Sequence, residues 1–337
     1  MNKKYSELAE LFRSEKTDEE ILDFLLNFHK NDIADMLAGM TEEERKRLYH
    51  LLGAQKTADV FKYIEDPRKY IKELTVESAA RVISEMDSDD AVDLLENLDP
   101  EEKEQIVRML DEDAKKDVKM LLSYDEEEIG SCMTTNYICI PENLTIRQAM
   151  SELVKQAGEN DNIMTIYVVD EKGVFAGAID LKDLIRAREN THLEDLVLKS
   201  YPYVTDHEKI DDCMDRILDY AEDSIPVLSE DKKILGVITS EDLIEMVDNE
   251  MGEDYAKLAG LTAEEDLKEP TLQSMKKRLP WLIILLFLGM GVSSVVGLFE
   301  NVVAVLPVVI CFQSLVLDMA GNVGTQSLAV TIRVLMD

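Results

Sequence analysis

Cysteine, histidine and tryptophan are scarce in this chain of 337 residues. The four cysteines form no CxxC pair and show no spacing typical of a disulfide framework: Cys132, Cys139, Cys213 and Cys311. The four histidines form no ligand pair, so the sequence predicts no zinc site. Scattered thiols of this kind suit a reducing cytosol.

Patterns typical of enzymes and of secreted proteins are also missing. The chain has no Gly-rich phosphate loop, no nucleophile–base pair and no metal triad, so we do not expect an enzyme. Its N-terminus, MNKKYSELAELF, turns acidic at once and contains no apolar core, so we do not expect a signal peptide.

Basic residues are few relative to acidic ones, 36 against 70, which gives a net charge of −34. The imbalance is confined to residues 1–270, which carry −35, because residues 271–337 contain four basic and three acidic residues. Such an acidic region repels nucleic acid and anionic lipid and attracts cations, so we expect no nucleic-acid partner. The alternative is that the acidity serves only solubility.

One long apolar run predicts a membrane span. Residues 279–299 include no charged residue, and at 1.5 Å per residue such a helix crosses a hydrocarbon core of about 30 Å. The alternative is a buried helix of a soluble domain. Lys276, Lys277 and Arg278 precede the run and Trp281 lies at interfacial depth, so the positive-inside rule places residues 1–278 in the cytoplasm.

A second span is expected over about 302–332, so residues 271–337 form the start of an α-helical membrane domain. Asp318 interrupts its apolar residues, and an ionisable group in a membrane helix usually faces a polar path. With Asn322 and Gln326 it makes a candidate ion pathway; the alternative is ordinary packing of small residues in GNVGTQS. Two spans cannot enclose a pathway, so we expect a fragment or a subunit.

Residues 1–124 are predicted to form an all-α superhelical domain of short repeated helices. Good helix N-caps recur at a constant spacing, each followed by acids and then by apolar residues at helical spacing: Thr75, Asp87, Asp99 and Asp111. Short amphipathic helices at a constant period bury their faces on their neighbours and form a scaffold.

Residues 125–240 contain an internal α/β repeat with an offset of 59. The pattern IYVV (166–169) followed by GAIDLKDLI (177–185) returns as IPVL (225–228) followed by GVITSEDLI (236–244). Each copy predicts two strands and then a helix. This resembles a pair of CBS domains, over 125–190 and 191–240. Such pairs often bind adenine nucleotides, which the resemblance assigns to Gly236, Thr239 and Asp242. The alternative is a purely structural Thr and Asp, and Asp180 in the first copy would repel phosphate.

An acidic connecting helix is expected within residues 241–270. Its sequence, SEDLIEMVDNEMGEDYAKLAG, carries a narrow apolar stripe surrounded by carboxylates, and like charges at this spacing destabilise a helix. One interpretation is a solvated face. Because the helix leads into the membrane span, the other is a charge-operated gate that magnesium closes, since this ion binds through one or two carboxylates and keeps its water.

The order of parts resembles the MgtE family of magnesium channel-transporters. The most specific segments are KLAGLTAEEDL (257–267), KKRLPWL (276–282) and GNVGTQSLAVTIR (321–333). The resemblance implies a multi-pass homodimer in the plasma membrane, with magnesium as both the transported and the regulatory ion. It also implies a "plug" helix and five membrane helices, of which this chain has the first two spans and lacks the later ones.

The resemblance further implies regulatory magnesium ligands in the N domain and the plug helix. On this sequence they are Asp90 and Asp93, then Asp242, Glu245, Glu250, Glu253 and Asp254. The chain departs from the family at Ala221, where an acid is expected, and around Ala320 and Asp318 in the membrane signature. Other interpretations are a CBS-regulated chloride channel, a transporter of another divalent cation such as cobalt, and a membrane-anchored sensor or scaffold without transport.

Overall fold

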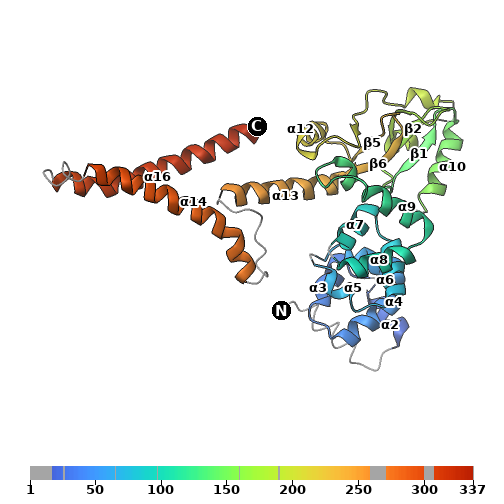
Figure 1. The fold of residues 1–337 in the computed structure, drawn as a ribbon. Coiled ribbons are helices and arrows are strands. Elements are labelled where there is room, and N and C mark those ends of the chain that lie inside the picture. The colour runs from blue at the N-terminus through green and yellow to red at the C-terminus, as the bar shows by residue number, and fades with distance from the viewer. Residues whose placement is uncertain are drawn as a thin grey trace. The chain divides into compact units, whose positions relative to one another are not determined.

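The structure is a computed structural model that describes residues 17–258, 271–299 and 307–336, apart from the single positions 26, 65, 97, 159 and 189. It divides into two compact units, one ending at Leu243 and one beginning at Ile244 (Figure 1). The first unit contains the helical N domain and the α/β repeat.

The N domain contains the predicted repeat of short helices. The helices described are α2 (Asp18–Leu25), α3 (Lys30–Leu37), α4 (Glu42–Phe61), α5 (Arg68–Ile71), α6 (Val76–Ser84), α7 (Ser88–Glu96), α8 (Pro100–Met109) and α9 (Glu112–Leu121). Thr75 caps α6 by accepting a bond from the Ser78 amide (3.3 Å), and Asp111 caps α9 by accepting one from the Ala114 amide (2.8 Å). Asp99 makes no capping bond, because its carboxylate pairs with Lys72 instead.

Alternate helices of the repeat stack on one another. Helix α6 packs against α8 and α7 against α9, and most of the apolar residues that follow each cap are buried, with Ile83 and Leu95 fully inaccessible. Because each helix buries one face on the next helix but one, the domain is a superhelical stack. The all-α prediction for this region is confirmed.

The α/β part consists of two similar three-stranded sheets. Its elements are β1 (Ile138–Pro141), α10 (Ile146–Gln156), β2 (Thr165–Val169), β3 (Phe175–Asp180) and α11 (Leu181–Arg186), then β4 (Val204–Thr205), α12 (Ile210–Tyr220), β5 (Ser224–Leu228) and β6 (Ile234–Thr239), with 3-10 turns η1 (Ile129–Cys132) and η2 (Leu193–Asp195). In each sheet, the first strand pairs parallel with the second, which pairs antiparallel with the third. The offset of 59 is reproduced strand for strand, since β2 and β3 match β5 and β6.

The two repeats exchange their leading segments. Thr134, ahead of the first repeat's β1, bridges to Val237 in the second sheet, whereas Leu198, ahead of β4, bridges to Ala178 in the first. A Cβ at Gly236 would lie 2.7 Å from the Thr134 carbonyl oxygen. The glycine that we assigned to a nucleotide motif therefore has a packing role, because only a residue without a side chain admits this strand.

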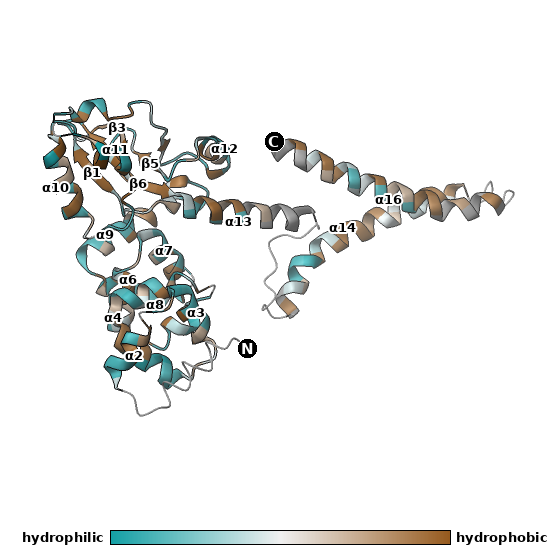
Figure 2. Ribbon diagram, turned by 180° about the vertical axis from the view of Figure 1, so that it is seen from behind, coloured by the Kyte–Doolittle hydropathy of each residue, from teal (hydrophilic) through white to brown (hydrophobic). Residues whose placement is uncertain are grey.

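The described part of the second unit is helical. Helix α13 (Ser240–Leu258) begins at the end of the first unit and continues into the second, which also contains α14 (Thr271–Leu298) and α16 (Pro307–Met336). Within residues 274–298 of α14, an 18-residue window has a mean hydropathy of 2.3, and none of this window is buried, unlike the core helix of a soluble domain (Figure 2). Among the described residues this is the one helix that is long and apolar enough to span a membrane. Helix α16 covers 307–332 of the second predicted span; residues 302–306 lie outside the described residues.

Candidate functional site

The start of α7 is fixed to the segment that leads into the first sheet. The Thr135 amide donates to Ser88 Oγ (2.9 Å), and Asn136 Nδ2 donates to Asp87 Oδ1 (2.8 Å). Farther along, Thr135 Oγ1 donates to Asp117 in α9 (2.8 Å). The N domain and the α/β repeat therefore meet at a specific junction, where Asp87 serves as a contact residue as well as a predicted helix cap.

Five carboxylates gather at this junction, and we call them the junction acids: Asp87, Asp89, Asp90, Glu241 and Asp242. Three come from the start of α7 and its cap, and two come from the first turn of α13, at the far end of the α/β repeat. Asp242 is held by a reciprocal cap, because the Thr239 amide donates to Asp242 Oδ2 (2.7 Å) and the Asp242 amide donates to Thr239 Oγ1 (3.3 Å).

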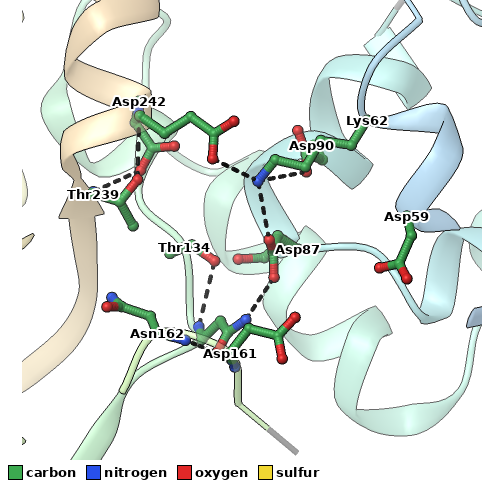
Figure 3. Close-up of polar contacts among 12 residues, drawn as sticks. Asp59, Lys62, Asp87, Asp90, Thr134, Asp161, Asn162, Thr239 and Asp242 are labelled. Atoms are coloured by element: carbon green, nitrogen blue, oxygen red, sulfur yellow. Dashed lines mark hydrogen bonds and ion pairs between the residues drawn. The ribbon is translucent and has the colours of Figure 1, made fainter. Parts of the chain in front are cut away.

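One ammonium lies among the junction acids. Lys62 follows α4, and its Nζ lies 3.4 Å from Glu241, 3.6 Å from Asp87 and 3.8 Å from Asp90 (Figure 3). Burial by itself would lower the pKa of Lys62, but the attraction of the surrounding carboxylates, Asp90 first, raises the pKa above its ordinary value. Lys62 is therefore fully charged at neutral pH.

Burial raises the pKa values of three junction acids, Asp89, Asp90 and Asp242, despite the nearby charge of Lys62. Burial raises the pKa of Asp90 to about 7, against the opposing effect of Lys62 and with the support of Asp87, Asp242 and Asp93. Burial also raises the pKa of Asp89 well above its ordinary range, and the nearby charge of Asp242 adds to this. The pKa of Asp242 is raised by burial as well, although its bonds from Thr239 oppose the shift. At neutral pH the junction therefore favours an additional proton or cation.

Asp89 supplies an oxygen that a cation would satisfy. Its Oδ1 is buried and has no hydrogen-bond partner among the described residues, and an unsatisfied buried acceptor costs about 1–3 kcal/mol. Within the part of the chain that the structure describes, no three His, Cys, Asp or Glu side chains converge as a ready-made metal cage. The donor set suits magnesium, which binds through one or two carboxylates and retains several waters.

Only some of the predicted ligands lie at the junction. Asp90 and Asp242 do, and Asp93, one turn along α7, is exposed but near enough to raise the pKa of Asp90. Glu245 is exposed on α13 in the second unit. Helix α13 also includes Glu250, Glu253 and Asp254, whose side chains lie outside those that the structure describes.

The candidate pathway residues lie on a single helix. Asp318, Asn322 and Gln326 follow one another at intervals of four in α16, so they share one face. All three side chains are exposed within the second unit.

Four of the residues at the junction were absent from the predicted ligand set: Asp87, Asp89, Glu241 and Lys62. Glu241 directly precedes the predicted Asp242 in the acidic helix. Asp87 and Asp89 belong to the run DSDDAVD, which the sequence already marked as acidic, so treating the whole run as candidate ligands would have found them. Lys62 gives no such signal, because it stands well before this run, at a helix end of ordinary composition.

The comparisons with known proteins cover the chain from end to end. Residues 28–127 match the family described as the MgtE intracellular N domain, and residues 127–190 and 193–249 each match the CBS domain. The magnesium transporter MgtE of Enterococcus faecalis is 39% identical over 99% of this chain and 74% of its own length. The magnesium transporters MgtE of Bacillus subtilis and Thermus thermophilus are 32% and 31% identical over 63% of this chain, which is about half of their own length (47% and 48%).

Solved structures give the same result for the first unit. The soluble part of a magnesium transporter is 31% identical with a TM-score of 0.69, covering 73% of this chain and 97% of that structure. The cytosolic domain of the Mg2+ channel MgtE in complex with ATP is 26% identical with a TM-score of 0.65, covering 72% and 99%. The chain shares the N domain and both CBS repeats with this family, and a named member is 39% identical over 99% of the chain. This chain therefore belongs to the MgtE family.

Proposed function

We propose that this protein transports magnesium across the membrane and that cytosolic magnesium, bound at the junction acids, regulates the transport. Membership of a family whose relatives are named magnesium transporters supports the transported ion. The junction acids support the regulation, because carboxylates from α7 and α13 meet there with too little positive charge.

A single observation carries the regulatory part: the buried Asp89 Oδ1 has no partner among the described residues and lies beside carboxylates whose pKa values are raised. A magnesium ion at this position would offset the repulsion between the N domain and the first turn of α13. Asp89, Asp90 and Asp242 are the residues that would hold it, with Asp87 and Asp93 nearby.

The arrangement in the membrane is part of the same proposal. Helix α14 is the first span of a multi-pass, homodimeric plasma-membrane protein, with residues 1–278 in the cytoplasm. The acids of α13, including Glu245, Glu250, Glu253 and Asp254, form the gate between sensor and span, and Asp318, Asn322 and Gln326 line the pathway. Light scattering of the full-length protein in mild detergent tests the oligomeric state: a monomer at micromolar concentration contradicts the dimer.

The transport experiment uses the full-length protein in vesicles, with separate assays for magnesium, cobalt and chloride. We expect magnesium flux that internal magnesium suppresses. In the double variant Asp89→Asn/Asp90→Asn the flux should become largely independent of internal magnesium, and Asp99→Asn, an exposed acid of the same repeat, serves as the matched control. Chloride flux or the absence of any flux would contradict the proposal, the latter in favour of a membrane-anchored scaffold without transport. Cobalt flux without magnesium flux would favour the cobalt alternative.

Adenine nucleotide binding at the CBS pair is a second candidate function. The observation that favours it is the ATP complex of the related cytosolic domain. In this chain Thr239 and Asp242 cap α13 and Gly236 admits a neighbouring strand, so these residues already have structural roles. Calorimetry with ATP on the parent and on Thr239→Val tests the assignment: equal affinity would place any nucleotide elsewhere.

A further inference from the structure

The position of Lys62 has a consequence beyond a magnesium sensor built from carboxylates. Its ammonium lies within 3.4–3.8 Å of carboxylates from both sides of the junction, Asp87 and Asp90 on one side and Glu241 on the other. An ammonium group that contacts both surfaces performs the electrostatic task of a bridging cation (Figure 3).

The lysine is held at this place by its surroundings. Its side chain is 28% exposed, similar to the 32% of Asp87 and the 28% of Asp90. It follows the last turn of α4, where its amide donates to the Ala58 carbonyl (3.2 Å). Because the backbone is fixed and the head group is partly buried, the charge cannot move away when another cation arrives without giving up ion pairs to both surfaces.

We propose that Lys62 is a resident cation of the junction, which holds the N domain against the CBS pair without magnesium and competes with magnesium for the junction acids. The proposal rests on the proposed magnesium regulation and deepens it. Lys62 then sets how strongly the junction depends on magnesium: one ammonium supplies a single charge, so part of the repulsion is left for the divalent ion to offset.

Removing the ammonium has two opposite effects. Without magnesium, the junction acids repel one another with no cation between them, so docking of the N domain weakens. With magnesium, the ion meets no competing charge, so it binds the variant more strongly. The gain in docking that magnesium produces is therefore larger in the variant than in the parent, whereas loss of a merely structural contact would weaken docking equally in both conditions.

Amide hydrogen exchange on the whole chain in detergent measures this gain. The Thr135 amide donates across the junction to Ser88 Oγ and reports docking, whereas the Ala149 amide of α10 donates to the carbonyl of the cap residue Thr145 and reports folding of the first CBS repeat. The two amides are followed with EDTA and with magnesium at constant ionic strength. We expect the magnesium-induced increase in Thr135 protection to be about tenfold larger in Lys62→Met than in the parent.

Two further variants isolate the charge. Lys62→Arg keeps it and should behave as the parent does. Lys72→Met removes a lysine that also pairs with two acids, Asp99 and Glu102, but within the N domain, so its magnesium gain should equal that of the parent. If the Ala149 amide shows that Lys62→Met is unfolded, Lys62→Gln takes its place.

The outcomes separate this inference from the proposed function. Equal magnesium gains in the parent and Lys62→Met would overturn the resident cation and leave magnesium regulation standing. A gain in Lys62→Met but none in the parent would support the resident cation and overturn magnesium binding at the junction of the parent. No gain in either protein would overturn both.

Discussion

The N domain places buried carboxylates in two contrasting environments. Glu73 faces Arg45, and both side chains are almost inaccessible, at 9% and 6% exposure. Arg45 Nε donates to Glu73 Oε2 (2.8 Å), a second nitrogen donates to Oε1, and the third donates to the carbonyls of Leu37 and Met40. Every charge in this pair is matched within the domain.

The junction acids have no such match. Lys62 is shared by Asp87, Asp90 and Glu241, while a buried oxygen of Asp89 has no partner among the described residues. A matched buried pair is part of the scaffold, whereas a group of carboxylates short of positive charge responds to cations and to pH. Net charge alone does not distinguish the two, because many acids of this chain lie on outer faces, as Glu42 and Glu104 do.

The first prediction breaks the matched pair. Arg45→Met should destabilise the N domain by about 3–5 kcal/mol, because it leaves the buried Glu73 carboxylate without a partner. Magnesium should not restore this loss, since the site lies away from the junction acids. Thermal unfolding with and without magnesium measures it. Arg108→Gln, which breaks the exposed pair with Glu104, is the control and should cost less than about 0.5 kcal/mol. If magnesium restored the thermal stability of Arg45→Met, the contrast between the Arg45–Glu73 pair and the junction acids would be contradicted.

The second prediction removes two negative charges from the junction acids. Asp89→Asn/Asp90→Asn should strengthen docking of the N domain at pH 8 without magnesium, by about 2 kcal/mol, because like charges are removed from a partly buried place. The same change should abolish most of the magnesium gain. Hydrogen exchange at the Thr135 amide measures both effects, and weaker docking in the double variant would show that these carboxylates are not in excess.

The third prediction concerns pH. The pKa of Asp90 is raised to about 7 in the docked state, so between about pH 4 and pH 7 the docked junction binds more protons than the undocked one. Docking without magnesium should therefore be strongest at low pH and weaken as the pH rises through 7. Asp90 should contribute about 1–2 kcal/mol to this loss, because its side chain is 28% exposed and solvent screens part of the effect. Saturating magnesium should flatten the profile. A magnesium-free profile that strengthens with rising pH would show the opposite linkage.

The fourth prediction extends the comparison to α13. Changing Glu250, Glu253 and Asp254 to Gln or Asn in the full-length protein should shift the magnesium midpoint for closure by about threefold, because like charges at helical spacing contribute roughly 0.2–0.5 kcal/mol per pair. Selectivity should not change. Open probability in inside-out patches, titrated with magnesium at constant ionic strength, provides the measurement. An unchanged midpoint and slope would make this acidic run a solvated face.

Much of the fold could be read from local sequence patterns. Helix caps at a constant spacing predicted α6 to α9, since a capped amphipathic helix is specified by one short run of consecutive residues. The repeat offset of 59 predicted the equivalence of β2 and β3 with β5 and β6. The uncharged run at 279–299 predicted α14 as a span, because length and hydropathy are sums over adjacent positions.

The sequence by itself therefore determined the type and order of the domains, the acidity of the region before the membrane helices and two members of the junction, Asp90 and Asp242. Only the tertiary structure decided which acids face one another and which cation stands between them. An exposed acid and a junction acid are chemically identical in sequence; they differ in burial and neighbours, which depend on how α4, α7 and α13 pack. Lys62 in the N domain reaches Glu241 beyond the whole α/β repeat, and no local pattern carries information over that distance.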